Sequence, residues 1–209
     1  MNLFRVLLHF IWPESFEEHK QEQELAPETQ NLEDEYISMM FESEPFMKNV
    51  DGLTVYSACV YHSAIKRIIY GFKYEDRKNL CLPLGRAMGK FFTPPKVDYI
   101  IPVPLHMDSK RKYNQSYELA KSISEIWNIK AIEAAKWTRA MPRRATLKAS
   151  ERIQLTPDDF TITRDIRGRR AAIIDDVCTT GTTLSCFARA LEQSGVWVVC
   201  AYTLAASEE

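Results

Sequence analysis

The sequence lacks the signatures of several common protein classes. Its five cysteines form no Cys-x-x-Cys pair and have no close histidine partner, which excludes an evident zinc ribbon or disulfide framework. No apolar run is long enough to cross a bilayer, since the apolar opening Met1–Trp12 has only twelve residues. That opening has no basic segment ahead of it and no small-residue cleavage site after it. We therefore expect reduced thiols, a cytoplasmic location and no membrane insertion.

Charge of one sign is not in excess, but it is unevenly distributed. The 209 residues hold 27 Lys and Arg against 28 Asp and Glu. Residues 1–60 contain twelve acidic and three basic residues, whereas residues 61–157 contain nineteen basic and eight acidic residues. Because few apolar side chains occur between Pro13 and Asp51, we expect residues 1–60 to form a peripheral, acidic N-terminal extension and residues 61–209 to form the folded domain. The basic part suits an anionic ligand.

Apolar periodicity after residue 60 predicts alternating helices and strands. Helices are expected after Ser63, over Leu84–Phe91, over Asn114–Trp127 and over Leu184–Leu191, the last closed by Gly195. Strands are expected at Val97–Val103, Phe160–Thr163, Ala171–Ile174 and Val196–Leu204, with Ile129–Ala134 ambiguous. The Ala171–Ile174 strand is expected to stop at the two aspartates that follow it. Strands separated by helices at these lengths predict an α/β fold with parallel crossovers.

One long segment has no clear period. Lys136–Asp159 is polar and basic, and a structureless segment of this length inside a compact domain indicates a functional or mobile loop. We call this segment the flap. Its cations could close over an anionic leaving group and exclude water, or each could be a solvated surface charge. They are Arg139, Arg143, Arg144, Lys148 and Arg152.

The most informative segment is Ala171–Thr183, which combines a strand, an acidic pair, a hydroxyl-rich turn and the start of a helix. Gly181 permits a left-handed turn, and the following helix begins with unpaired N–H groups, so the turn is suited to a phosphate. The lysine of a GxxxxGK[ST] loop is missing, which favours a monophosphate over a nucleoside triphosphate.

The acidic pair restricts the ligand further. Ionised Asp175 and Asp176 would repel a phosphate unless they face sugar hydroxyls or a divalent cation, and a phosphorylated sugar satisfies both parts of the segment. The alternative is purely structural: the aspartates end a strand and the neighbouring threonines cap a helix.

This segment resembles the PRPP (phosphoribosyl pyrophosphate) motif of the type I phosphoribosyltransferases, in which the acidic pair contacts the ribose hydroxyls and the Thr/Gly loop holds the 5-phosphate. Further segments are similar to the ComF family, which bacteria use in competence. They are Tyr61–Arg67, Phe72–Tyr74, Pro102–His106, Arg111–Gln115 and Leu119-Ala120. The resemblance implies a type I phosphoribosyltransferase-like parallel sheet flanked by helices.

The chain also departs from the ComF pattern. Lys112, Arg144 and Leu155 stand where the family usually has Gly, Gln and Asn, and the family's N-terminal cysteine-rich zinc ribbon is missing. We therefore expect no structural metal, and an acidic extension that would repel nucleic acid.

The resemblance implies a site and a reaction. It assigns catalytic roles to Asp175, Asp176 and Arg152. It assigns PRPP binding to Asp175, Asp176, Thr179, Thr180, Gly181, Thr182, Thr183, Pro104, Leu105 and Arg111. Magnesium would be held mostly by oxygens of the ligand, and pyrophosphate would be displaced at the anomeric carbon by an acceptor such as a nucleobase.

Several residues near the motif have two possible roles. His106 is either a general base or a surface histidine. Asn114 and Gln115 either orient the pyrophosphate loop or cap the helix that begins there. Cys178 has no basic neighbour in the sequence, which favours packing over nucleophilic chemistry.

Two other functions remain open at this point. The protein could bind PRPP or another phosphorylated metabolite without turnover, as an accessory in DNA uptake. It could instead bind single-stranded nucleic acid through its basic residues, with aromatic side chains stacking on bases. Helical spacing favours core packing for Phe72 and Tyr117. The aromatic candidates are Tyr70, Phe72, Tyr74, Tyr113, Tyr117 and Trp137.

Overall fold

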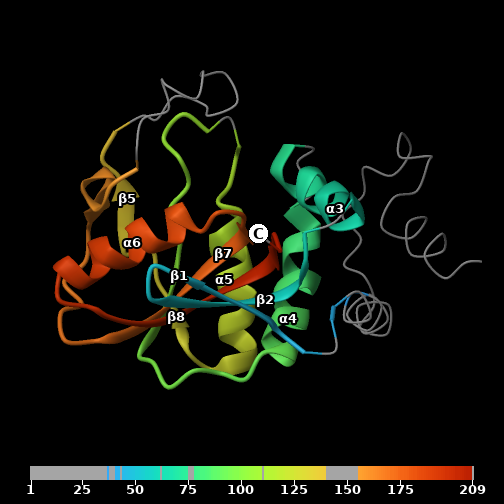
Figure 1. The fold of residues 1–209 in the computed structure, drawn as a ribbon, viewed down its shortest axis with the longest axis horizontal. Helices are drawn as coiled ribbons and strands as arrows, with labels where there is room; N and C mark the ends of the chain where they lie inside the picture. The colour runs from blue at the N-terminus through green and yellow to red at the C-terminus, as the bar shows by residue number, and fades with distance from the viewer. Residues whose placement is uncertain are drawn as a thin grey trace, which may run out of the picture.

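The computed structural model describes residues 37, 41–42, 44–61, 63–74, 78–109, 111–139 and 155–208. Within them, six strands form one sheet in the order β1-β2-β8-β7-β3-β4, and β5 and β6 form a small second sheet (Figure 1). The strands are β1 (Phe46–Val50), β2 (Leu53–Val60), β3 (Tyr99–Pro102), β4 (Lys130–Ala131), β5 (Ala135–Trp137), β6 (Phe160–Ile162), β7 (Arg170–Cys178) and β8 (Trp197–Ala206). The helices are α3 (Ser63–Tyr74), α4 (Cys81–Phe91), α5 (Gln115–Trp127) and α6 (Thr182–Gln193), with 3-10 turns η1 (Lys78–Leu80) and η4 (Pro157–Asp159).

The large sheet is parallel except at one edge. β2, β8, β7, β3 and β4 run parallel, and only β1 pairs antiparallel, to β2. Helices cover both faces, as expected for parallel strands that are buried on both sides. The structure therefore confirms the predicted α/β class with a parallel sheet flanked by helices.

The two faces of the sheet have separate hydrophobic cores. Apolar side chains of α3, α4 and α5 pack with Ala172 and Ile174 of β7 on one face. Apolar side chains of α6 pack with Ala171 and Ile173 on the other face, together with residues of β5 and β6. The alternation of side chains along β7 thus explains why Ala171–Ile174 reads as an uninterrupted apolar run.

Most helices form where the sequence predicts them. α3, α4, α5 and α6 coincide with the expected periodic segments, and the predicted strand at Val97–Val103 is present as the shorter β3. The expected end of the strand before Asp175 is wrong. β7 continues to Cys178, because Asp175, Val177 and Cys178 pair with Thr203, Ala205 and Ala206 of β8.

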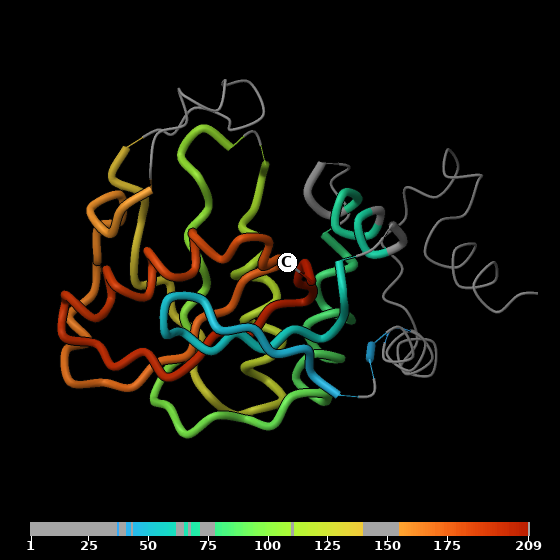
Figure 2. Tube along the Cα trace, viewed as in Figure 1, coloured from blue at the N-terminus to red at the C-terminus, as the bar shows by residue number. Residues whose placement is uncertain are grey.

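The β1–β2 hairpin was not predicted. Figure 2 shows it lying alongside β8, and Val55–Val60 pair in register with Ala201–Ala206. The large sheet therefore begins before the domain boundary that we expected between residues 60 and 61. The apolar opening Met1–Trp12 lies outside the described residues, and none of the helices in the described part has the length and apolar character needed to span a bilayer.

Candidate functional site

The Ala171–Thr183 segment and the loop after β3 lie at the same edge of the sheet. β3 and β7 are parallel neighbours, and the Val103 amide donates to the Ile174 carbonyl at 2.9 Å. In parallel sheets, ligands bind at the edge where the strands have their carboxyl ends. This pairing therefore brings the Pro104 loop next to the acidic pair in the C-terminal half of β7.

Asp175, the first residue of the acidic pair, is fixed to the start of α5. Ser116 Oγ donates to Asp175 Oδ1 at 2.7 Å, and the Asp176 amide donates to the same oxygen at 2.9 Å. Asp175 is half-buried, whereas Asp176 is only 6% exposed. No local pattern indicates that Ser116 and Asp175, 59 residues apart in the chain, are in contact. The contact holds the first carboxylate in one orientation.

The turn before α6 has the predicted geometry. Gly181 has a left-handed φ of 78° and occupies the N-cap position of α6, and the first turn of a helix has N–H groups without acceptors inside the helix. A Cβ at Gly181 would lie 2.5 Å from both γ carbons of Val50, so glycine is needed for space as well as for backbone conformation. The hydroxyls of Thr180 and Thr182 are 3.0 Å apart. The predicted turn is therefore confirmed as a structure, whereas its ligand stays a prediction.

Lys48 is a further residue of this region that sequence reasoning missed. It lies on β1, and its Nζ donates to the Thr179 carbonyl at 3.0 Å, which places a cation beside the turn. Phe46 and Val50 lie two residues before and two residues after Lys48, on the same side of β1, and both pack into the hydrophobic core between the sheet and α6. The signal in the sequence is a lysine that alternates with apolar residues on the inward side of a strand.

The loop after β3 is held by the start of α5. Asn114 Oδ1 accepts from the Ser116 amide at 3.1 Å, and Asn114 Nδ2 donates to the Val103 carbonyl at 3.0 Å. Asn114 thus caps α5 and also anchors the loop, which unites the two roles considered for it. Arg111 donates through Nη1 to Oε1 of the buried Gln115 at 3.0 Å, so both predicted residues are oriented at the loop.

Trp137 attaches the base of the flap to the same loop. Its Nε1 donates to the Pro104 carbonyl at 2.8 Å, and its ring packs against His106, with the ring centroids 4.8 Å apart. Partial burial lowers the pKa of His106, which favours the neutral imidazole. Trp137 is itself buried, so its proposed role as an exposed platform for stacking a base is wrong.

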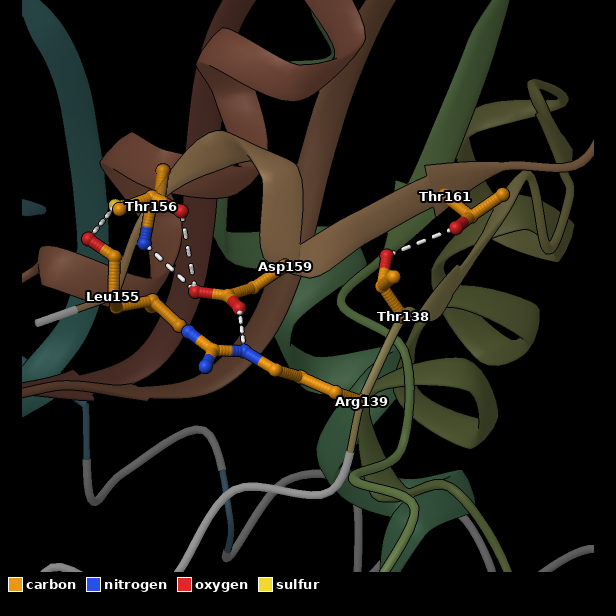
Figure 3. A network of polar contacts seen from close by, with 7 residues as sticks. Thr138, Arg139, Leu155, Thr156, Asp159 and Thr161 are labelled. Carbon is orange, nitrogen blue, oxygen red and sulfur yellow. Dashed lines mark hydrogen bonds and ion pairs between the residues drawn. The ribbon is translucent and has the colours of Figure 1, made fainter. Parts of the chain in front are cut away.

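The two ends of the flap are joined by an ion pair (Figure 3). Arg139 donates to the carboxylate of Asp159, which is only 2% exposed and also accepts from the Thr156 amide at 2.9 Å. The hydrogen bond from Arg139 lowers the pKa of Asp159. This pairing gives Arg139 a structural role in place of the ligand or solvent contact that we expected. The other flap cations, Arg143, Arg144, Lys148 and Arg152, lie outside the described residues.

The cysteines have the properties of packing residues. Cys178 is 1% exposed, and burial raises the pKa of its thiol. All five cysteines are free and buried. Among the residues that the structure describes, no three His, Cys, Asp or Glu side chains cluster as a metal site would require.

Comparisons with known proteins agree with this arrangement. A domain family described as "Phosphoribosyl transferase domain" matches residues 81–209. The chain is 33% identical over 155 residues to the DNA utilization protein YhgH of Escherichia coli O6:H1, which covers 67% of this chain and 68% of that protein. It is 30% identical over 109 residues to competence protein F of Haemophilus influenzae, which covers 46% of this chain and 45% of that protein.

The comparison with solved structures gives weaker likenesses. An adenine phosphoribosyltransferase from Thermoanaerobacter pseudethanolicus aligns with a TM-score of 0.44 and 18% identity, over 83% of this chain and 87% of that chain.

Proposed function

We propose that this chain, which belongs to the phosphoribosyl transferase domain family and is ComF-like within it, binds PRPP or a related phosphorylated ribose at the carboxyl edge of β7 and β3. One observation carries the proposal. The turn at Gly181 presents the start of α6 directly after an acidic pair, and Ser116 holds the first carboxylate of that pair in place. An anion site and a hydrogen-bond acceptor for a diol thus adjoin each other, as a phosphorylated ribose requires.

The 5-phosphate would bind at the turn. The N–H groups of the first turn of α6 and the hydroxyls of Thr179, Thr180, Thr182 and Thr183 are donors that a phosphate can accept from. Asp175 and Asp176 are acceptors, and the ribose 2- and 3-hydroxyls would donate to them. This assignment uses each group according to its hydrogen-bonding capacity.

The pyrophosphate would bind at the loop after β3. Pro104 has no N–H, and its carbonyl already accepts from Trp137, so the amide donors of this loop begin at Leu105. Arg111 would add a positive charge near this loop, on a side chain that Gln115 orients. Arg152 of the flap is proposed to contact the leaving group.

Magnesium fits this site as a ligand-borne ion. The acidic pair is assigned to the ribose hydroxyls, and the described residues contain no cluster of three His, Cys, Asp or Glu side chains, so phosphate oxygens and water would supply the octahedral shell. When bound, the ion would neutralise charge on the departing pyrophosphate. The chain itself would hold the ribose by its hydroxyls and 5-phosphate, which exposes the anomeric carbon to an acceptor such as a nucleobase and limits the freedom of both reactants.

The cellular role is proposed from the names of the relatives. A DNA utilization protein and a competence protein suggest that this chain serves in the uptake or use of DNA. The two experiments below, on ligand binding and on pyrophosphate release, distinguish an enzyme from a protein that binds the ligand only for regulation.

Binding is tested by titrating PRPP with magnesium and following the melting temperature. At one hundred times Kd, the ligand should stabilise the protein by about 2.7 kcal/mol, or roughly 5–10 °C for a chain of this size. Asp175→Asn and Asp176→Asn should remove this shift while leaving the ligand-free melting temperature near that of the wild type. Glu192→Gln removes an exposed carboxylate far along α6 and should keep the shift. An unchanged response in both aspartate variants would refute the site.

Turnover is tested by measuring release of pyrophosphate from PRPP with each common nucleobase. Release that depends on one base identifies the acceptor. Stabilisation by PRPP without release in any mixture would leave a binding module in place of an enzyme.

A further inference from the structure

The structure places a lysine from the N-terminal hairpin at the proposed phosphate site. Lys48 Nζ donates to the carbonyl of Thr179, the residue that opens the turn, at 3.0 Å. Lys48 and Thr179 are 131 residues apart in the chain. The hairpin also lies outside the family match at residues 81–209. The contact therefore adds a cation from a part of the chain that the family's motif does not contain.

The residues that follow Lys48 anchor its strand beside the turn. Val50, two residues on, is buried and contacts the turn so closely that Gly181 has no room for a side chain. Asp51 lies 3.7 Å from Arg189 of α6, which adds a second link between the hairpin and this helix. The C-terminal end of β1 is thus held against the turn, and the Lys48 side chain reaches Thr179 from this anchored strand.

The positive charge of Lys48 acts on Cys178, the last residue of β7. Burial raises the pKa of Cys178, and the nearby Lys48 ammonium opposes that rise. A cation in this place is unusual for a strand face that packs into a core. A lysine at an inward position of an edge strand can also serve to prevent pairing with other chains, so the two roles must be separated by experiment.

We propose that Lys48 is a binding residue for the 5-phosphate, and that the β1–β2 hairpin completes the phosphate site. The inference rests on the proposed function. In this arrangement the turn supplies amide and hydroxyl donors, and Lys48 supplies the full positive charge that the motif itself lacks. The ligand class is a ribose 5-phosphate ester, and the contact is with its phosphate and not with the pyrophosphate.

Calorimetric titration with two probes tests the assignment. The probes are ribose 5-phosphate, which carries only the 5-phosphate, and magnesium pyrophosphate, which carries only the leaving group. Lys48→Met should weaken binding of ribose 5-phosphate about tenfold, as expected for one charge-assisted hydrogen bond at a partly exposed site, and should leave pyrophosphate binding unchanged. Lys48→Arg should recover most of the loss, because it restores the charge.

A matched control uses an exposed lysine at the other end of the sheet. Lys130 starts β4 and pairs with Tyr99 at the beginning of β3, so Lys130→Met removes the same charge away from the site and should change neither affinity. Equal affinity of Lys48→Met and the wild type for ribose 5-phosphate overturns the assignment. So does an equal loss for both probes, since it would indicate a general effect of charge or folding. If the wild type binds neither ribose 5-phosphate nor PRPP, the proposed function itself fails.

Discussion

Replacing Gly181 by alanine measures how tightly the turn and the hairpin fit together. The new Cβ would lie 2.5 Å from both γ carbons of Val50 and 3.0 Å from its β carbon, and φ would stay near 78°. The left-handed conformation costs an alanine about 1–2 kcal/mol. Overpacking against a buried valine adds about 1–3 kcal/mol. The sum predicts a loss of roughly 2–5 kcal/mol in the free energy of unfolding.

Gly168→Ala provides the matched control. Gly168 also has a positive φ, of 71°, but an added Cβ there meets nothing within 4 Å. This variant should therefore lose only the conformational cost. The difference between Gly181→Ala and Gly168→Ala in urea unfolding gives the energy of the contact with Val50.

A double-mutant cycle tests the cause directly. Val50→Ala removes the two γ carbons that would clash, so in its presence Gly181→Ala should cost about 1–3 kcal/mol less than it does alone. If the two substitutions add within about 0.5 kcal/mol, the proposed close contact between β1 and the turn is refuted.

Three other substitutions or probes test separate parts of the structure. Trp137→Phe keeps an aromatic ring but removes both the donor to the Pro104 carbonyl and part of the buried indole, so it should cost at least about 1 kcal/mol of unfolding free energy, and an unchanged urea midpoint would contradict the hydrogen bond. The pKa of Asp159 is lowered, so its ion pair should stabilise the protein fully above about pH 4 and lose this effect as the pH falls through the pKa of the folded state. The difference in unfolding free energy between the wild type and Asp159→Asn should therefore shrink on acidification. A difference that stays constant with pH would refute this role. Because all five thiols are free and buried, Ellman's reagent should react slowly with the native protein and titrate five thiols after unfolding; rapid labelling of native Cys178 would show that the end of β7 is open to solvent.

The elements that the sequence predicts best are those with a strong local pattern. α6 follows from the spacing of Leu184, Phe187 and Leu191, and the turn before it follows from Gly181 among its threonines. These signals are local, since helical periodicity and the conformational freedom of glycine act within one or two turns. The predicted helix after Ser63 forms for the same reason.

The features that sequence reasoning missed depend on contacts between distant residues. β7 continues through the aspartates because Thr203 and Ala205 of β8 pair with it, and a charged pair ordinarily predicts the end of a buried strand. The β1–β2 hairpin follows an acidic segment, yet Leu53, Val55 and Ser57 alternate with more exposed residues in the manner of a half-buried strand. The hairpin lies beside β8 because β2 pairs with residues about 145 positions later in the chain, and no local sequence pattern predicts such a distant pairing.

The same place beside β8 bears on how shortened versions of the protein would behave. A fragment that begins at residue 81, where the family match begins, would lack β2. Residues Ala201–Ala206 of β8 would then form an exposed, apolar edge strand with unpaired backbone N–H and C=O groups. Exposed edge strands pair with other chains, so the fragment should precipitate or form intermolecular sheets even though its Ala171–Thr183 segment is intact.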